Sequence, residues 1–517
     1  LKNELIMKAL ESLVPFGHAL KISKFLVTAT LALAVFPVAQ AGTVVGVTVS
    51  APDQVLPASI NVVNVDANDD VYGVYDTVGL AAGVPSTVSI VVQSDQGSAL
   101  GYYADNLQDG SSLGDFAAYM TVSSQTSQST GLHIYAGETS VSVGKIGGNL
   151  TVVGARDAVG MEFNKAAVGN ISANVTVSGA EGVSGIVAYS TVLDDIAGNW
   201  HISGSAAESL VAGIYSFDSL SGYGKIGTAT SSMTVTTAGG MAMAFGLYDS
   251  QGIPVSTLAG KVEVYAGDAA QYGLAAVFVI GEGTPTTAHT VHLENGTQLL
   301  ATSVRTPEWA FVIACGRGYQ DFVFSGEDPA GTYLMKGGVA MMTGSLRVEN
   351  GTYLWTDLHT ARTDALIIDA TFGSTIMNVA SSAKVVLQNN ASLLNERFTV
   401  DGELIATAKN ISDFSQVTIG DGTTFDGSGK ITLRIANDFS SFDGEQMQFF
   451  VFTNATLDAD LMASFTVTWE DGSLVDPSLW SFDAAMGIVT FGDIPEPAAA
   501  AGVLGILALA LTARRRR

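Results

Sequence analysis

Three stretches of the chain align at a constant offset of 25 residues: Ile146-Gly147-Gly148-Asn149-Leu150-Thr151-Val152, Ile171-Ser172-Ala173-Asn174-Val175-Thr176-Val177 and Ile196-Ala197-Gly198-Asn199-Trp200-His201-Ile202. A period of this length is typical of stacked repeats. Each unit holds short Val, Ile and Thr runs without helical periodicity, and it cannot bury its apolar face alone. Stacking pairs each strand with its equivalents about 4.8 Å above and below. The repeat therefore predicts an all-β chain that forms a parallel β-solenoid, or β-helix.

Strand alternation assigns the two faces of these repeats. The side chains expected to point inward are Leu150, Val152, Val175, Val177, Trp200 and Ile202. Those expected to point outward are Thr151, Thr176 and His201. Asn149, Asn174 and Asn199 share one position before the strand, which predicts a ladder of stacked side-chain amides at a turn.

Two further patterns extend the repeat along the chain. A Gly-apolar element recurs every 25 to 33 residues, and we expect its glycines at turns that need positive φ; they are Gly73, Gly101, Gly131, Gly160, Gly185, Gly213, Gly246 and Gly273. Residues 293–300, 348–355 and 387–394 resemble one another and predict a strand, an Asn-Gly-type turn and a second strand. Together these patterns place the solenoid over residues 42–435.

The pattern changes from about Ile435, where aromatic residues crowd together at Phe439, Phe442, Phe449, Phe450, Phe452, Trp469, Trp480 and Phe482. An aromatic-rich β segment at this place predicts a cap over residues 436–493 that covers the exposed edge and core of the last coil. A small separate β domain is the alternative.

The end of the chain carries three features in a fixed order. Pro495, Glu496 and Pro497 precede the uncharged apolar stretch 498–513, and the sequence closes on four arginines, Arg514, Arg515, Arg516 and Arg517. The stretch predicts a short transmembrane helix, and the arginines should remain on the cytoplasmic side. A buried hydrophobic C-terminal helix is the alternative.

Residues 494–517, taken together, resemble the PEP-CTERM sorting signal of bacterial exported proteins. In that family an exosortase, a membrane-embedded transpeptidase, recognises the Pro-Glu-Pro motif, the helix and the basic tail, and removes the tail during export. The resemblance implies a destination at the cell surface or in the extracellular matrix. It implies nothing about the activity of the preceding chain.

The start of the chain also predicts export. Lys21 and Lys24 precede the apolar run 25–36, and the small-residue site Ala39-Gln40-Ala41 follows it. This order is typical of a secretory signal peptide. We expect signal peptidase to cleave after Ala41, so that residues 1–41 form a leader and the mature chain begins at Gly42.

Charge and cysteine content limit the classes of function. Without the six charged residues of 1–41 and the four terminal arginines, 15 basic and 47 acidic residues remain. Such a chain repels a phosphate backbone, so we expect no nucleic-acid partner. Cys315 is the sole cysteine, lies in an apolar run and is expected to be a buried, inert thiol.

The chain contains only weak matches to catalytic or metal-binding patterns. Asp194-Asp195 is the best carboxylate pair for glycoside hydrolysis, but no neighbouring motif completes a hydrolase site. The other partial matches are 110–114 to a nucleophile elbow, 427–430 to a P-loop, 66–70 to a calcium loop, and the pair His289 and His292. We therefore predict no catalytic residue, no metal site and no cofactor, although weak calcium binding at 66–70 stays open.

These observations predict an exported structural or adhesive protein without catalytic activity, at the cell surface or in the extracellular matrix. Its expected partners are signal peptidase and exosortase during export, the membrane through the C-terminal helix, and an exopolysaccharide. The alternative is a carbohydrate-active enzyme on the same fold, either a polysaccharide lyase or a glycoside hydrolase.

Overall fold

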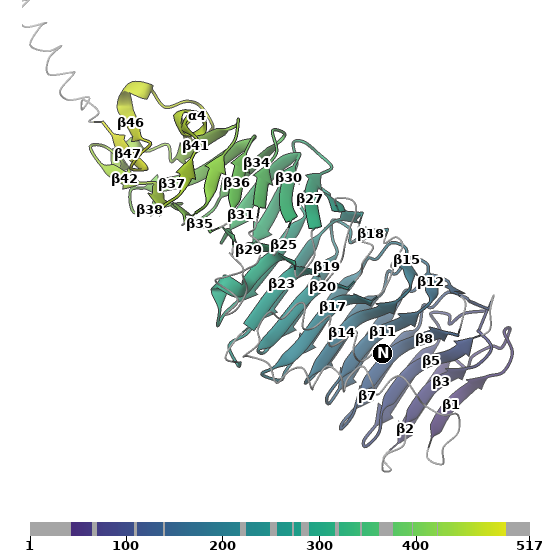
Figure 1. Cartoon of the computed structure of the whole chain (residues 1–517). Helices are drawn as coiled ribbons and strands as arrows, with labels where there is room; N and C mark the ends of the chain where they lie inside the picture. The colour runs from purple at the N-terminus through teal and green to yellow at the C-terminus, as the bar shows by residue number, and fades with distance from the viewer. Residues whose placement is uncertain are drawn as a thin grey trace, which may run out of the picture.

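The computed structural model describes the following residues: 43–64, 70–107, 111–137, 140–217, 224–248, 256–270, 273–280, 289–315, 320–341, 344–360, 376–394, 396–420 and 422–492. They form one elongated stack of coils, with β1 at one end and β46 and β47 at the other (Figure 1). The described chain is all-β with long parallel sheets, which confirms the solenoid predicted from the repeat. The predicted leader 1–41 and the sorting signal 494–517 lie outside the described residues. Within the described ranges, no helix is long and apolar enough to cross a membrane.

Two long sheets run the length of the stack. Sheet A has fifteen strands, in the order β1 (Val44–Val49), β3 (Val71–Asp76), β5 (Ala99–Leu107), β8 (Ser129–Ala136), β11 (Ala158–Asn164), β14 (Gly182–Tyr189), β17 (Ser209–Phe217), β20 (Gly240–Tyr248), β23 (Gly273–Ile280), β26 (Ala310–Cys315), β29 (Gly338–Met341), β32 (His359–Thr360), β35 (Ala391–Leu393), β39 (Val417–Ile419) and β43 (Phe450–Phe452).

Sheet B has a strand in each coil as well. Its order is β2 (Ser59–Asn64), β4 (Ser89–Ser94), β7 (Tyr119–Ser124), β10 (Asn149–Gly154), β13 (Asn174–Gly179), β16 (Asn199–Gly204), β19 (Ser232–Thr237), β22 (Lys261–Ala266), β25 (Gln298–Ser303), β28 (Thr332–Lys336), β31 (Gly351–Thr356), β34 (Ala383–Leu387), β37 (Glu403–Asn410), β41 (Lys430–Ile435) and β45 (Thr466–Trp469). A short strand, β38 (Asp413–Phe414), pairs antiparallel with β37.

A third face closes each coil. In the early coils it holds four short strands, β6 (Ser112–Leu113), β9 (Val141–Val143), β12 (Ala166–Val168) and β15 (Val192–Leu193). Single bridges run beside them through Val84, Phe116, Ile146, Ile171, Ile196 and Ile226. From β18 (Lys225–Ile226) to β44 (Thr456–Leu457) the third face is a nine-stranded parallel sheet. The isoleucine that opens each 25-residue repeat therefore marks the buried corner of the third face.

The predicted register of the repeat is confirmed residue by residue. Asn149 pairs with Asn174, and Leu150, Val175 and Trp200 stand in one row across β10, β13 and β16. All three side chains of that row are buried, as are Val152, Val177 and Ile202. Alternate positions face solvent, because the pleat points successive side chains to opposite sides.

The glycines of the Gly-apolar element do not lie at turns, so the expectation of positive φ was wrong. Six of them, with Gly46, lie inside sheet A strands: Gly73, Gly101, Gly131, Gly160, Gly185 and Gly213. Their φ values are not positive. The reason for glycine is space: a Cβ on Gly160 would lie 2.5 Å from the carbonyl oxygen of Gly185 and 3.0 Å from Val177 Cγ2. Gly246 and Gly273 fall outside this row, where Ala244 continues it.

The Asn-Gly-type turns also differ from the hairpin pattern. The first connects β24 (His289–Leu293) of the third face to β25 of sheet B, and the second connects β30 (Gly344–Glu349) to β31. Asn350 and Gly351 adopt φ values of 51° and 113°, which suits a tight corner. Each turn therefore joins two different parallel sheets, and the third repeat, 387–394, joins β34 to β35 in the same way.

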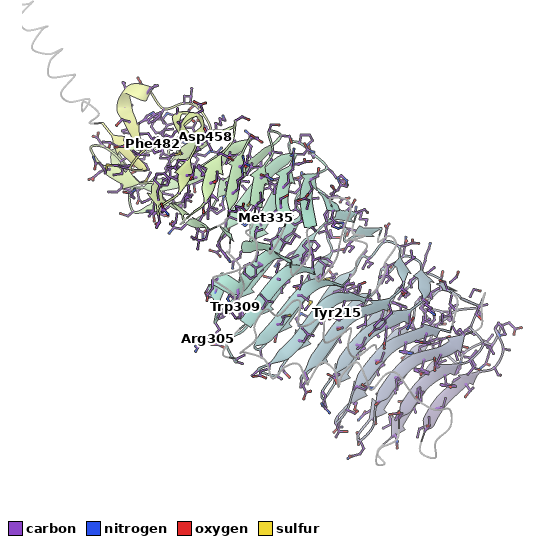
Figure 2. The ribbon with its side chains drawn as sticks, viewed as in Figure 1. Tyr215, Arg305, Trp309, Met335, Asp458 and Phe482 are labelled. Atoms are coloured by element: carbon purple, nitrogen blue, oxygen red, sulfur yellow. The ribbon has the colours of Figure 1, made fainter. Side chains whose placement is uncertain are left out.

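The parallel sheets continue beyond residue 435 into β43, β44 and β45. The segment 436–493 also contains a short helix, α4 (Ala459–Ala463), and an antiparallel sheet of β42 (Gln446–Gln448), β47 (Ile488–Phe491) and β46 (Trp480–Asp483). This sheet contacts the last coil, since the ring centroids of Phe465 and Phe482 are 4.1 Å apart. Figure 2 places Phe482 and Asp458 together at this end of the molecule.

Candidate functional site

The outer face of sheet B from β2 to β19 carries no Asp, Glu, Lys or Arg, although the chain is strongly acidic. Each of these seven strands points three side chains outward. They are Ser59, Asn61, Val63, Ser89, Val91, Gln93, Tyr119, Thr121, Ser123, Asn149, Thr151, Val153, Asn174, Thr176, Ser178, Asn199, His201, Ser203, Ser232, Thr234 and Thr236. We call this set the uncharged face. Hydroxyl and amide groups dominate it, and all its side chains are exposed or half-buried.

One edge of the uncharged face is a ladder of amides, as the repeat predicted. Asn174 Nδ2 donates to Asn149 Oδ1 at 3.0 Å, and the backbone N–H of Asn199 donates to Asn174 Oδ1 at 3.1 Å. Ser232 Oγ then donates to Asn199 Oδ1 at 3.0 Å. The ladder thus joins four successive coils. At the third coil the donor is the backbone N–H of Asn199 and not its side-chain amide.

The central row of the uncharged face is rich in threonine. Thr121, Thr151 and Thr176 are successive partners across β7, β10 and β13, and Thr234 follows after His201. Within the part of the chain that the structure describes, none of these four hydroxyls hydrogen-bonds to another protein group. They remain available to a ligand, at intervals of about 4.8 Å along the stack.

The uncharged face ends at β22, where charged pairs begin. Lys261 Nζ lies 2.7 Å from Glu263 Oε2, and farther along Lys336 Nζ donates to Thr302 Oγ1 at 2.9 Å. The Lys261–Glu263 pair is locally neutral, whereas Lys336 keeps its positive charge beside an uncharged hydroxyl.

The outer face of sheet A is different, because it is aromatic and closely packed. Tyr75, Tyr103, His133 and Glu162 occupy one outward row. The rings of Tyr103 and His133 stack at 4.6 Å, and His133 Nδ1 lies 3.0 Å from Glu162 Oε2. Tyr103, His133 and Glu162 are all buried, so this row supplies packing and a hydrogen-bonded His–Glu pair but few free hydrogen-bonding groups.

In the acidic pair Asp194-Asp195, the carboxylate of Asp195 has a structural partner. Asp195 Oδ1 accepts from the backbone N–H of Lys225 in the next coil at 2.7 Å. Asp115 Oδ1 accepts from the backbone N–H of Lys145 in the same manner at 2.8 Å. At two places in the stack, therefore, an aspartate carboxylate binds a backbone N–H of the next coil and stabilises the connection there. No sequence motif indicated this role.

The remaining candidates stay scattered. His289 and His292 lie on opposite sides of β24, the first buried and the second exposed, and burial lowers the pKa of His289. Lys430, at the end of the partial P-loop match, forms an ion pair with Glu403 at 3.2 Å. Asp70 accepts from Ser98 N, while 65–69 and 110 lie outside the described residues. Cys315 ends β26.

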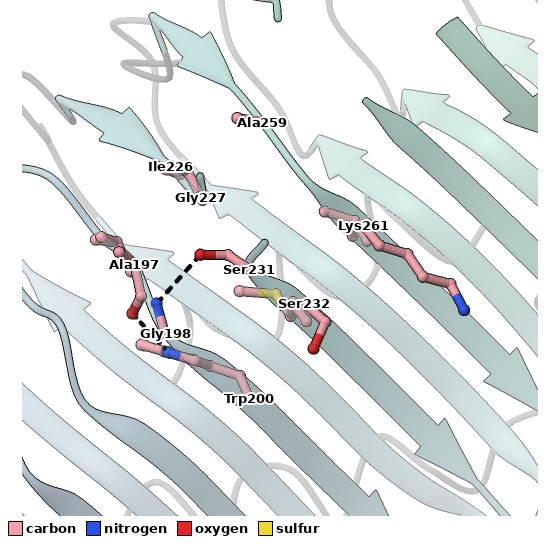
Figure 3. A pocket seen from close by; sticks show the side chains of 12 residues that line it. Ala197, Gly198, Trp200, Ile226, Gly227, Ser231, Ser232, Ala259 and Lys261 are labelled. Carbon is pink, nitrogen blue, oxygen red and sulfur yellow. Dashed lines mark hydrogen bonds between the residues drawn. The ribbon is translucent and has the colours of Figure 1, made fainter. Parts of the chain in front are cut away.

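Two further features of the described residues bear on ligand binding. No group of three or more His, Cys, Asp or Glu side chains is placed to hold a metal ion within the described ranges. A small pocket with a cavity volume of about 20 Å³ lies at the corner between the third face and sheet B (Figure 3). Ser231 accepts from Gly198 N at its rim, and Trp200 Nε1 donates to Ala197 O. Ligand pockets usually enclose about 300–1,000 Å³, so this corner is small and open.

Comparison with known proteins adds no relative: no family model, no curated protein and no solved structure matches this chain.

Proposed function

We propose that this protein is an exported structural or adhesive component of the cell surface or extracellular matrix, without catalytic activity. Signal peptidase removes residues 1–41, and an exosortase handles the tail with Pro495, Glu496 and Pro497. Before processing, the helix at 498–513 holds the chain in the membrane. The order of motifs at both ends of the sequence supports this route.

The observation that carries the proposal is the uninterrupted stack of coils with an uncharged face along its first half. Fifteen strands in sheet B, at about 4.8 Å each, give a rod of roughly 70 Å. Its cohesion comes from strand pairing between coils, so it is stiff along its axis. Such a rod holds a flat binding face at a distance from the membrane.

We propose a neutral polysaccharide as the ligand of the uncharged face. Free threonine hydroxyls and the exposed ring of Tyr119 suit the hydroxyl groups and apolar patches of sugar rings. An acidic polysaccharide would be repelled, because 47 acidic and only 15 basic residues lie outside the leader and the terminal arginines. A long flat face with many weak contacts favours an extended polymer over a small molecule, because such contacts act multivalently.

Two measurements on cells that express the full-length chain test the proposal. Fractionation and mass spectrometry of both termini should find the protein at the surface, beginning at Gly42 and cut near Pro497. Full-length protein with Arg517 intact in the cell interior would contradict export.

Binding is then measured on the recovered protein with a neutral β-glucan and with polygalacturonate. The double change Thr151→Val and Thr176→Val should weaken glucan binding several-fold, because it removes two hydroxyls and keeps the strand. Thr290→Val, which removes an exposed hydroxyl of β24, is the matched control. Release of reducing or unsaturated ends from either polymer would favour the alternative, a carbohydrate-active enzyme.

A further inference from the structure

The N-terminal end of the solenoid core is incompletely covered within the described residues. Val44 and Val47 of β1 pair with Val71 and Val74 of β3, and all four point toward the core. Val71 and Val74 are completely buried, whereas Val44 and Val47 are only half-buried. The first described coil therefore leaves apolar surface open at its end.

Within the described residues, the strands at this end carry neither of the residue types that usually protect a sheet edge, charged residues and proline. β1 and β2 are the first strands of sheets A and B, and their sequences, Val-Val-Gly-Val-Thr-Val and Ser-Ile-Asn-Val-Val-Asn, contain no charge and no proline. Natural edges are normally blunted by charged residues, by proline or by coverage. Asp53 is the one charged residue of the connection 50–58, so little repulsion opposes contact even in this acidic chain.

The opposite end is closed. Phe442, Phe449 and Phe450 are completely buried there, and the antiparallel sheet of β42, β47 and β46 adjoins the last coil. Phe450 of the last coil packs against Phe482 of β46, with ring centroids 6.2 Å apart. Within the described residues, the C-terminal end therefore presents no open coil to a second copy, so we do not expect head-to-tail stacking into filaments.

We propose that two copies of this chain associate head to head through β1 and β2. A two-fold axis at the N-terminal end runs β1 antiparallel to β1 of the second copy, so that sheet A continues across the contact. Val44 and Val47 of each copy then become buried against their counterparts. The inference rests on the proposed export in one respect: removal of residues 1–41 leaves only Gly42 and Thr43 ahead of β1.

The size of the end sets the expected strength. A strand of six residues is about 20 Å long, so the end presents on the order of 400 Å² per copy. A total of about 800 Å² is below the roughly 1,200 Å² of standard interfaces, and the dimer should dissociate in the micromolar range. Copies held close together on a cell surface would still form the dimer, because their effective concentration would exceed the dissociation constant.

Sedimentation velocity of the protein recovered from expressing cells, from about 1 to about 200 µM, should show a monomer that converts to a dimer. Small-angle scattering should give a dimer about twice as long as the monomer. Val45→Lys and, separately, Val63→Lys place a charge on the two edge strands and should each weaken the dimer at least ten-fold. Val153→Lys, at a similarly exposed position of β10, is the matched control and should leave it unchanged.

A cysteine cross-link gives the orientation independently of these charge changes. Val45→Cys in a Cys315→Ser background should form a disulfide-linked dimer on mild oxidation, and Val153→Cys should not. A monomer at every concentration, a dimer of unchanged length, or equal loss with Val153→Lys would overturn the inference. Mass spectrometry of the N-terminus separates the two proposals: a monomer that begins at Gly42 removes the dimer and leaves export standing.

Discussion

Asn174 Nδ2 donates a hydrogen bond to Asn149 Oδ1 at 3.0 Å, although the two residues are 25 positions apart in the chain. The bond runs along the axis of the stack, parallel to the backbone pairing of β10 with β13. A side-chain bond of this kind ties the register of one coil to the next, because a shift by one residue would break it.

Asn174→Ala should lower the free energy of unfolding by about 1 kcal/mol, since it removes two partly exposed hydrogen bonds. Thermal unfolding followed by circular dichroism measures the change. Asn61→Ala, at an exposed position of β2 without a ladder bond, should have little effect. Equal losses in both variants would show that the ladder adds nothing.

Gly160→Ala should destabilise the protein by roughly 2–4 kcal/mol, because the new Cβ would meet the Gly185 carbonyl oxygen at 2.5 Å. The control is Gly147→Ala, where the nearest atom, Ser172 Oγ, lies at 3.5 Å and the added methyl fits. Denaturant unfolding of both variants compares them. Similar midpoints would mean that the glycine row has no steric role.

Tyr102 should make the protein sensitive to alkali. Burial raises the pKa of Tyr102, and the nearby carboxylate of Asp76, which accepts from its hydroxyl at 2.5 Å, raises it further. Above pH 10 the unfolded chain loses this proton while the folded chain keeps it. Stability should therefore fall with rising pH by about 1.4 kcal/mol per unit for this group.

Denaturant unfolding between pH 9 and 11 measures that slope. Tyr102→Phe should be less stable at pH 7, because Asp76 loses a donor, and its stability should fall less steeply above pH 10. Tyr119→Phe removes an exposed phenol of sheet B and serves as the control. An unchanged slope in Tyr102→Phe would contradict the assignment.

Glu403 should contribute stability that acid removes. Burial raises the pKa of Glu403, but the Thr432 hydroxyl and the ammonium groups of Lys430 and Lys384 lower it more, so its pKa is below the ordinary value. The contribution is present above about pH 4.3, the usual carboxyl value, and is lost as pH falls through the lower folded value.

Glu403→Gln should cost about 1 kcal/mol at pH 7, a figure kept small because both lysines are more than half exposed. The loss of stability between pH 5 and 3 should be less steep in this variant than in the parent protein. Glu263→Gln, which breaks an exposed pair within one strand, is the control. An identical acid profile for Glu403→Gln and the parent would refute the role.

Much of the fold could be predicted from residues 146–202, because a 25-residue period repeats one environment. Val152 and Val177 are 25 residues apart and occupy the same inward position of the alternating strand pattern. Their burial in one row follows from these two properties. We assigned the glycine row to turns instead. The sequence shows that glycine is needed at these positions, but not whether the backbone requires positive φ or a neighbouring group leaves no room for a Cβ. At Gly160 the reason is a carbonyl from another coil.

The candidate binding face was predictable only in part. Thr151 and Thr176 were expected outside from alternation, but the earlier coils with Ser59 and Ser89 lack the recognisable repeat. Their place in the uncharged face follows from the pairing of β2 with β4 and of β4 with β7, and no sequence motif indicates either pairing. Likewise, the sequence shows Asp195 only as one of two adjacent carboxylates, which is a pattern of catalytic sites. Its hydrogen-bond donor, the backbone N–H of Lys225, is 30 residues away, so the structural role could not be predicted from neighbouring residues.

The sequence by itself determined that the chain stacks, how long each central coil is, and which side chains of that region point inward, since period and alternation are local properties. The motifs at both ends predict export from the sequence alone, and this stays a prediction. Only the tertiary structure decided that three faces close each coil, that one of them is free of charge over seven strands, and that, within the described residues, the last coil is covered more completely than the first. Those features depend on which coils become neighbours, and contacts between distant segments are set by packing of the whole stack.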